Sequence, residues 1–239
     1  MKKSIFYTIM ISLVLVLAAC NADDGQEDAQ ETGTDQVQEQ EQPEQEPLEI
    51  TDEERVDEET SVVSVNGQEV EGAKYNQIYT QIKTMMHQYG QDVSDTDLLK
   101  EQAISILVEQ ELINQEAEKK GIEVTEEEAN EELETIKAET GDQFATILDQ
   151  YQMDEEGFKN QLIDDLLTAK YMEQELDVEV TDKEVEEYYN QLKEQNGEIG
   201  EFEEVEQDIK SLLQEQKQSE QLQARINELR EEAEVETLI

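Results

Sequence analysis

The chain has 239 residues, of which 64 are acidic and 17 are Lys or Arg, so its formal net charge at pH 7 is −47. Nucleic acid is excluded as a partner, because so dense a polyanion repels phosphate backbones and offers no basic patch. Cys20 is the only cysteine, which excludes an internal disulfide, so the folded part must be stabilised by its core alone.

The first 20 residues have the layout of an export signal. Lys2 and Lys3 precede a mostly apolar run over residues 5–19, which is too short to span a hydrocarbon core of about 30 Å comfortably and lacks a stop-transfer flank. The run ends in Leu-Ala-Ala-Cys20, which resembles the lipobox of bacterial lipoproteins. This resemblance implies transfer of a diacylglycerol to the Cys20 sulfur and cleavage of residues 1–19. The mature lipoprotein is then expected at the cell membrane, on its extracytoplasmic face. The alternative is an ordinary signal peptide with a cysteine there by chance.

Residues 20–60 are expected to be the lipidated cysteine followed by a disordered acidic linker. Residues 21–59 are dominated by Asp, Glu and Gln, hold both prolines, Pro43 and Pro47, and contain too few apolar side chains to bury a core. Repulsion between like charges keeps such a segment extended, which favours a tether that carries the folded part away from the membrane. An acidic ion-binding segment is the weaker alternative, because the chain has no Asp-x-Asp-x-Asp-Gly calcium loop.

Removal of Lys2 and Lys3 with the signal would change the formal charge from −47 to −49. Concentrated salt screens the self-repulsion of such a chain. A saline or alkaline habitat is therefore a hypothesis that the composition suggests.

Short extended segments are expected at the two ends of a folded domain over residues 61–239. Residues 61–65 are rich in Val and end at Asn66-Gly67, a turn signal that leads into residues 68–70. Near the C-terminus, residues 233–239 alternate in the same manner. We therefore expect a hairpin at the start of the domain and a C-terminal strand that pairs with it.

Everything between these segments favours helix, because apolar residues recur at three-and-four spacing and no proline interrupts the chain. Thr125 with Glu128, and Thr181 with Glu184, each have the spacing of a capping box at a helix start. About seven helices are expected, over residues 73–89, 96–120, from 125, 142–152, 154–176, from 181, and 202–233.

Two of these helices differ from an ordinary amphipathic helix. The one over residues 96–120 is apolar on more than one side and is expected to be the buried central helix. The last one has apolar clusters at its two ends and a wholly polar stretch at residues 214–221, which predicts a helix that bridges two packed ends across solvent. The expected fold is mainly α: an elongated multi-helix domain with short terminal β-strands.

Three segments in order resemble the N-terminal domain of SurA-type periplasmic chaperones and PrsA-type foldase lipoproteins: residues 63–70, 107–121 and 124–128. In that family a segment similar to residues 180–189 leads into an inserted parvulin prolyl isomerase domain, and a helix similar to residues 202–233 returns from it. Here only residues 191–201 separate the two flanks, too few for a parvulin domain. The resemblance therefore implies a peptide-binding chaperone body without its isomerase.

The sequence offers few residues that could form a catalytic site. His87 is the only histidine, and its place near the end of a helix before Gly90 favours a residue that interacts with the helix dipole over a catalytic one. Acidic pairs are too frequent to indicate a site, and the chain has no Gly-rich phosphate loop or Cys/His metal cluster. We expect no enzyme activity, no catalytic residue, no bound metal and no cofactor.

Tyrosine and methionine are the side chains best suited to hold many unfolded segments weakly, since they are adaptable and partly polar. For most of them ordinary core packing is the alternative. The expected partners are unfolded or nascent secreted proteins, and a single dedicated partner or a prolyl isomerase activity are the alternative functions. The candidate peptide-binding residues are Tyr75, Tyr79, Met85, Met86, Tyr151, Met153, Tyr171, Met172, Tyr188 and Tyr189.

Overall fold

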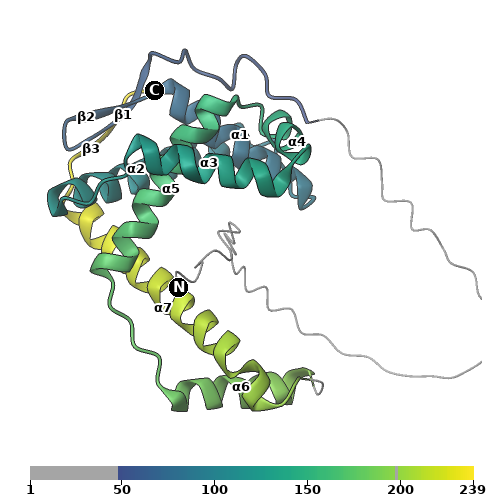
Figure 1. Cartoon of the computed structure of the whole chain (residues 1–239). Helices are drawn as coiled ribbons and strands as arrows, with labels where there is room; N and C mark the ends of the chain where they lie inside the picture. Colours follow the sequence, from purple (N-terminus) through teal and green to yellow (C-terminus); the bar gives the residue numbers. More distant parts are fainter. Residues whose placement is uncertain (1–47, 197–198) are drawn as a thin grey trace, which may run out of the picture. The chain divides into compact units, whose positions relative to one another are not determined.

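A computed structural model of the chain describes residues 48–196 and 199–239 (Figure 1). The expected signal segment, Cys20 and the expected linker up to residue 47 lie outside the described residues. The described part is mainly α, as predicted, with seven helices and one small antiparallel sheet.

The sheet consists of β1 (Ser61–Val65), β2 (Gln68–Glu71) and β3 (Val235–Thr237) in the order β2-β1-β3. Asn66 and Gly67 both have positive φ, at 55° and 84°, which is the backbone of the tight hairpin turn that the Asn-Gly pair predicts. β3 pairs antiparallel with β1, with Ser64 opposite Glu236. The predicted pairing of the two ends of the domain is therefore confirmed.

The helices follow the predicted pattern closely, and four of the seven begin at a residue whose side chain caps the first turn. Thr125 and Glu128 form a full capping box, and the Thr181 side chain likewise accepts a hydrogen bond from the backbone N–H of Glu184 at 3.3 Å. Gly121, with φ 73°, ends the second helix in the left-handed conformation that glycine adopts most easily. The helices are α1 (Gly72–Gln88), α2 (Thr96–Lys120), α3 (Glu126–Thr140), α4 (Gln143–Gln150), α5 (Glu155–Glu175), α6 (Asp182–Asn196) and α7 (Phe202–Glu232).

The largest hydrophobic core, here called the central cluster, is built around α2, as its apolar composition predicts. Leu107 and Ile113 of α2 are almost fully buried, together with Val63 of β1 and Tyr79 of α1. β1 packs on α2, and α1 packs against both α2 and the hairpin (Figure 1). A smaller cluster joins α3, α4 and α5 through Leu133, Phe144 and Leu162.

A separate core, here called the α6–α7 cluster, contains Val180, Val185, Tyr189 and Ile209. α7 contributes to both this cluster and the central cluster, where its Ile226 and Leu229 are buried.

The polar middle of α7 is mostly exposed, but it is not free of contacts. Lys217 donates hydrogen bonds to the Glu179 carbonyl oxygen at 2.7 Å and to the Glu184 carboxylate at 2.6 Å. The segment that leads into α6 therefore lies beside this stretch of α7, where the polar sequence predicts only solvent.

Residues 48–60 belong to the folded part, although the sequence analysis assigns them to the linker. Ile50 and Val56 pack against the central cluster, and the Asn76 side chain forms two hydrogen bonds with the backbone of Val56, at 3.0 and 2.8 Å. Gly72 lies so close to this segment that an added Cβ would collide with the carbonyl oxygen of Asp57. These contacts, together with a buried ion pair between Glu54 and Lys83, dock the segment, so an acidic composition alone does not locate the end of the linker.

Candidate functional site

A groove with a volume of about 950 Å³ lies among the described residues. Its walls come from β2, the first half of α1, α2 at Glu111, the turn before α5, and the first half of α5. α1 and α5 meet beside it, because the Gln77 side chain donates hydrogen bonds to the Gly157 carbonyl oxygen at 3.3 Å and to Gln161 at 2.9 Å.

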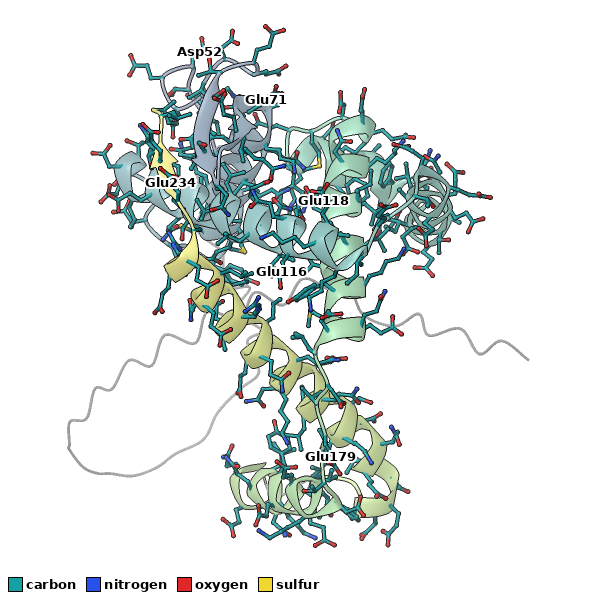
Figure 2. All side chains as sticks on the ribbon, turned by 90° about the vertical axis from the view of Figure 1, so that its left-hand side faces the viewer. Asp52, Glu71, Glu116, Glu118, Glu179 and Glu234 are labelled. Atoms are coloured by element: carbon teal, nitrogen blue, oxygen red, sulfur yellow. The ribbon has the colours of Figure 1, made fainter. Side chains whose placement is uncertain are left out.

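The groove is strongly acidic. Seven of its lining side chains carry a carboxylate and two carry a cation, Arg55 and Lys74. Figure 2 shows many side chains of the described part that end in oxygen atoms, with Glu71 labelled beside the sheet. The lining acids are Glu58, Glu69, Glu71, Glu111, Asp154, Glu156 and Asp164.

The two cations in the groove are already engaged by the protein. The Lys74 ammonium pairs with the Asp164 carboxylate at 2.8 Å, and Asn114 donates a second hydrogen bond to that carboxylate at 3.0 Å. The Arg55 guanidinium donates to the side-chain oxygen of Gln152 at 2.8 Å. With seven carboxylates against these two cations, the groove keeps an excess of negative charge.

Burial raises the pKa of two carboxyls on and beside α5. It raises the pKa of Asp165 to about 6, and the neighbouring Asp164 charge raises it further. Burial also raises the pKa of Glu111, against the opposing effects of the Gln115 hydrogen bond and the Lys74 charge. Of these carboxyls, Glu111 and Asp164 line the groove, so this wall brings acidic groups together in a poorly solvated place.

Neutral groups complete the lining. Apolar surface comes from Val70, Ala73, Met153 and Ile163, and hydrogen-bonding groups come from Asn76, Gln77, Thr80 and Asn160. No histidine or cysteine lines the groove, and the residues that the structure describes contain no group of three potential metal ligands. The arrangement is suited to binding and offers no nucleophile with an adjacent base.

The ten candidate Tyr and Met residues are not brought together. Tyr75, Tyr79 and Tyr171 are each 2% exposed in the central cluster, and Tyr189 is buried in the α6–α7 cluster. The Tyr79 hydroxyl donates to Glu54 at 2.7 Å and is not available to a ligand. These four positions therefore agree with the core-packing alternative.

The other six candidates are half-buried, and only one of them lines the groove. That residue is Met153, in the turn before α5. The remaining five are Met85, Met86, Tyr151, Met172 and Tyr188. His87 lies in the last turn of α1, the position that the helix-dipole interpretation predicts.

Sequence reasoning missed the acidic lining, because acidic residues are so frequent that no subset stands out. It also missed Glu54, whose carboxylate receives hydrogen bonds from Tyr79 and Lys83. A weak signal was present, since Lys83 is a cation on the face of α1 that also carries Tyr75, Tyr79 and Ile82. A cation in such a position needs a buried anionic partner.

Among the described residues, no helix combines the length and the apolar composition that crossing a membrane requires.

Over 144 residues the chain is 34% identical to the foldase protein PrsA of Caldanaerobacter subterraneus. That alignment covers 56% of this chain and 43% of the relative, so the chain spans less than half of the relative's length. A solved SurA-like chaperone of Campylobacter jejuni is similar over 74% of this chain and 98% of its own, with 12% identity and a TM-score of 0.48.

The family described as SurA-like N-terminal domain matches residues 1–172, which is most of the chain. The match contains the β1–β2 hairpin, α1 to α4 and nearly all of α5, and so every wall of the groove. The chain belongs to the SurA-like N-terminal domain family.

Proposed function

We propose that this protein is an extracytoplasmic, lipid-anchored chaperone that holds unfolded segments of secreted polypeptides without catalysing their isomerisation. The observation that carries the proposal is the groove of about 950 Å³, built from the domain that defines the family. Its volume lies within the range of protein ligand sites.

The lining suits weak and general binding of a polypeptide. Asn76, Gln77, Thr80 and Asn160 offer donors and acceptors to a peptide backbone, which is the same in every client. Met153 and Ile163 add adaptable apolar surface for side chains. A site of this composition holds many sequences without requiring one of them.

The absence of catalysis is supported by the length of one connection. Five residues, 197–201, join the end of α6 to the start of α7, at the place where the resemblance puts the parvulin insertion. A proline-peptide isomerisation assay is expected to give the uncatalysed rate in the presence of the protein. A rate that rises in proportion to protein concentration would restore the isomerase alternative.

The lipid anchor is proposed from Cys20 and tested there. A Cys20→Ala variant is expected to leave the membrane fraction of cells, whereas the unchanged protein sediments with membranes. Mass spectrometry of the unchanged protein should find an N-terminal cysteine that carries a diacylglycerol. An unmodified N-terminus upstream of residue 20 would contradict the proposal.

The central experiment is photocrosslinking in intact cells, with a photoreactive amino acid in place of Met153 in the groove. The matched control carries it at Glu215, an exposed residue of α7 that does not line the groove. A broad set of unrelated secreted proteins at position 153, and few at position 215, is the expected result. One dominant product at position 153 would favour the dedicated-partner alternative, and equal products at both positions would remove the groove from consideration.

Purified full-length protein in detergent should also suppress aggregation of a denatured secreted protein. The absence of suppression at a several-fold molar excess would count against a chaperone function.

A further inference from the structure

The strand β2 is an edge of the sheet, and it lines the groove. The strand order β2-β1-β3 leaves one side of β2 without a neighbouring strand among the described residues. Glu69, Val70 and Glu71 of this strand are part of the groove wall. An uncovered strand edge presents unpaired backbone groups to which an extended peptide can add.

The register of the hairpin identifies which backbone groups are unpaired. Val65 and Gln68 flank the two-residue turn and form a hydrogen-bonded pair, so the next pair, Ser64 and Glu69, is a non-hydrogen-bonded one. Ser64 turns its N–H and C=O toward β3, where it stands opposite Glu236. The N–H and C=O of Glu69 therefore point away from β1, and they have no partner among the described residues.

The charge of the groove indicates what kind of chain would occupy this edge. Glu58, Glu71 and Glu156 line the groove and form no ion pair within the described part of the chain. A strand carrying Lys or Arg would meet these carboxylates on entering the groove. A neutral strand would gain the backbone hydrogen bonds alone.

Charge also argues against the two occupants that the protein itself could supply. Residues 4–54 contain no Lys or Arg, so the chain before the hairpin would bring further negative charge to the groove. A second copy carries a formal charge of −47 and would be repelled at the same edge. A cationic segment of another polypeptide is the occupant that remains.

We propose that the groove selects extended, Lys/Arg-containing segments of client proteins and that such a segment adds to β2 as an edge strand, pairing with the N–H and C=O of Glu69. This proposal rests on the proposed chaperone function and narrows it to a client class. The backbone hydrogen bonds supply sequence-independent affinity, and the carboxylates supply the preference for cations.

The first test measures binding of two labelled peptides to the full-length protein in detergent by fluorescence anisotropy. The peptides have the same β-prone sequence, with Lys at alternate positions in one and Gln in the other. We expect the Lys peptide to bind about tenfold more tightly at low salt, and the difference to shrink in molar salt. Equal affinities at low salt would overturn the proposal.

The second test separates the groove from the general charge of the protein. The triple variant Glu58→Gln, Glu71→Gln, Glu156→Gln removes three groove carboxylates. The control Glu203→Gln, Asp208→Asn, Glu215→Gln removes the same charge from exposed positions of α7. The groove variant is expected to lose most of the preference for the Lys peptide and the control to keep it, and equal losses would overturn the proposal.

The third test addresses the strand edge. Glu69→Pro removes the N–H that points away from β1, a change that an edge strand tolerates, while Glu69→Gln changes the side chain and keeps the N–H. Only the proline variant should weaken binding of the Gln peptide, in which the strand hydrogen bonds are the main attraction. Hydrogen exchange in residues 68–71 of the unchanged protein should also slow when either peptide binds, so the result does not depend on how the proline variant folds. Unchanged exchange there would overturn the strand addition.

The outcomes distinguish this inference from the proposed function. The Lys peptide and the Gln peptide are each photocrosslinked to the protein that carries the photoreactive amino acid at position 153. If both peptides crosslink equally, the groove binds polypeptides without regard to charge, and only the proposed client class is wrong. If neither peptide crosslinks there, the groove is not the binding site, and the proposed function fails with it.

Discussion

The Lys83 ammonium on α1 pairs with the Glu54 carboxylate, and both side chains are almost withdrawn from solvent, with 8% and 7% of their surface exposed. The same carboxylate accepts a hydrogen bond from the Tyr79 hydroxyl at 2.7 Å, and Lys83 also donates to the Glu49 carbonyl oxygen at 2.8 Å. This network attaches residues 48–60 to the central cluster. The network lies beside the part of α1 that lines the groove. In that part, the side chain of Asn76 is hydrogen-bonded to the backbone of Val56.

Removal of one partner of this pair should destabilise the protein by about 3–5 kcal/mol, because the other charge stays buried without a counter-charge. The variants are Glu54→Gln and Lys83→Met, with Glu53→Gln as an exposed control on the same segment. The free energy of unfolding from urea denaturation is the measurement. The double variant should lose clearly less than the sum of the two single losses, and simple additivity would mean that the pair is not coupled.

The acid stability of the protein should depend on the same carboxyl. Burial alone would raise the pKa of Glu54, but hydrogen bonds from Lys83, Thr51 and Tyr79 lower it from 4.5 to about 2. A depressed carboxyl pKa stabilises the fold fully above the unfolded value and loses this contribution as the pH falls. The free energy of unfolding should therefore fall between about pH 4.5 and pH 2.

The matched experiment repeats this pH series with Glu54→Gln. The variant should be less stable at neutral pH and should lose less stability across the acid window, so the two curves converge. Parallel curves would show that Glu54 is not the titrating group, and would direct attention to Glu128 and Glu184. Hydrogen bonds from Lys170 and Lys217 lower the pKa of these two carboxyls to about 2 as well.

Asp165 should have the opposite effect. Burial, with the Asp164 charge, raises the pKa of Asp165 from 3.8 to about 6, so the folded state binds this proton more tightly than the unfolded chain does. The fold is then penalised above the folded pKa, and the penalty disappears as the pH falls toward the unfolded value. Asp165→Asn should stabilise the protein at pH 8 by about 1–2 kcal/mol, once solvent screening is allowed for, and should have little effect near pH 4.

The control for this prediction is Asp149→Asn, which removes an exposed aspartate of α4. It should change stability little at either pH. An equal effect of Asp165→Asn at pH 4 and pH 8 would indicate a packing change and would contradict the titration argument.

The α6–α7 cluster should open independently of the central cluster. Tyr189 packs edge-to-face on Phe202, with ring centroids 5.3 Å apart, and its hydroxyl donates to the Gly200 carbonyl oxygen at 3.0 Å. Tyr189→Ala should cost about 3–5 kcal/mol locally, because it leaves a cavity in a small core. Hydrogen exchange should accelerate in α6 and the first half of α7, while β1 and α2 keep their protection.

Asn190→Ala, at the exposed neighbouring position of α6, is the control and should leave exchange unchanged. Equal acceleration in α2 would show that the two cores unfold as one cooperative unit.

The sequence alone determined which elements form. The helix starts at Thr125 and Thr181, the turn at Asn66-Gly67 and the helix end at Gly121 depend on local backbone and capping preferences, which neighbouring residues decide. The central place of α2 was also predictable, because a helix that is apolar on several sides can only be buried. The pairing of the C-terminal strand with β1 followed from the same alternation at both ends of the domain.

Only the tertiary structure decided which residues of those elements form a site. The groove gathers β2, α1, α2 and α5 from across the sequence, and no local pattern separates its seven carboxylates from the many others of the chain. The burial of each aromatic residue likewise depends on tertiary packing. Tyr79 and Tyr188 both lie in helices among apolar residues at three-and-four spacing, but Tyr79 is buried and Tyr188 is half-buried. Docking of residues 48–60 depends on one buried ion pair and two apolar contacts between segments some thirty residues apart. The spacing of apolar residues indicates which face of a helix or strand is buried, whereas a site depends on which helices and strands come together in the fold.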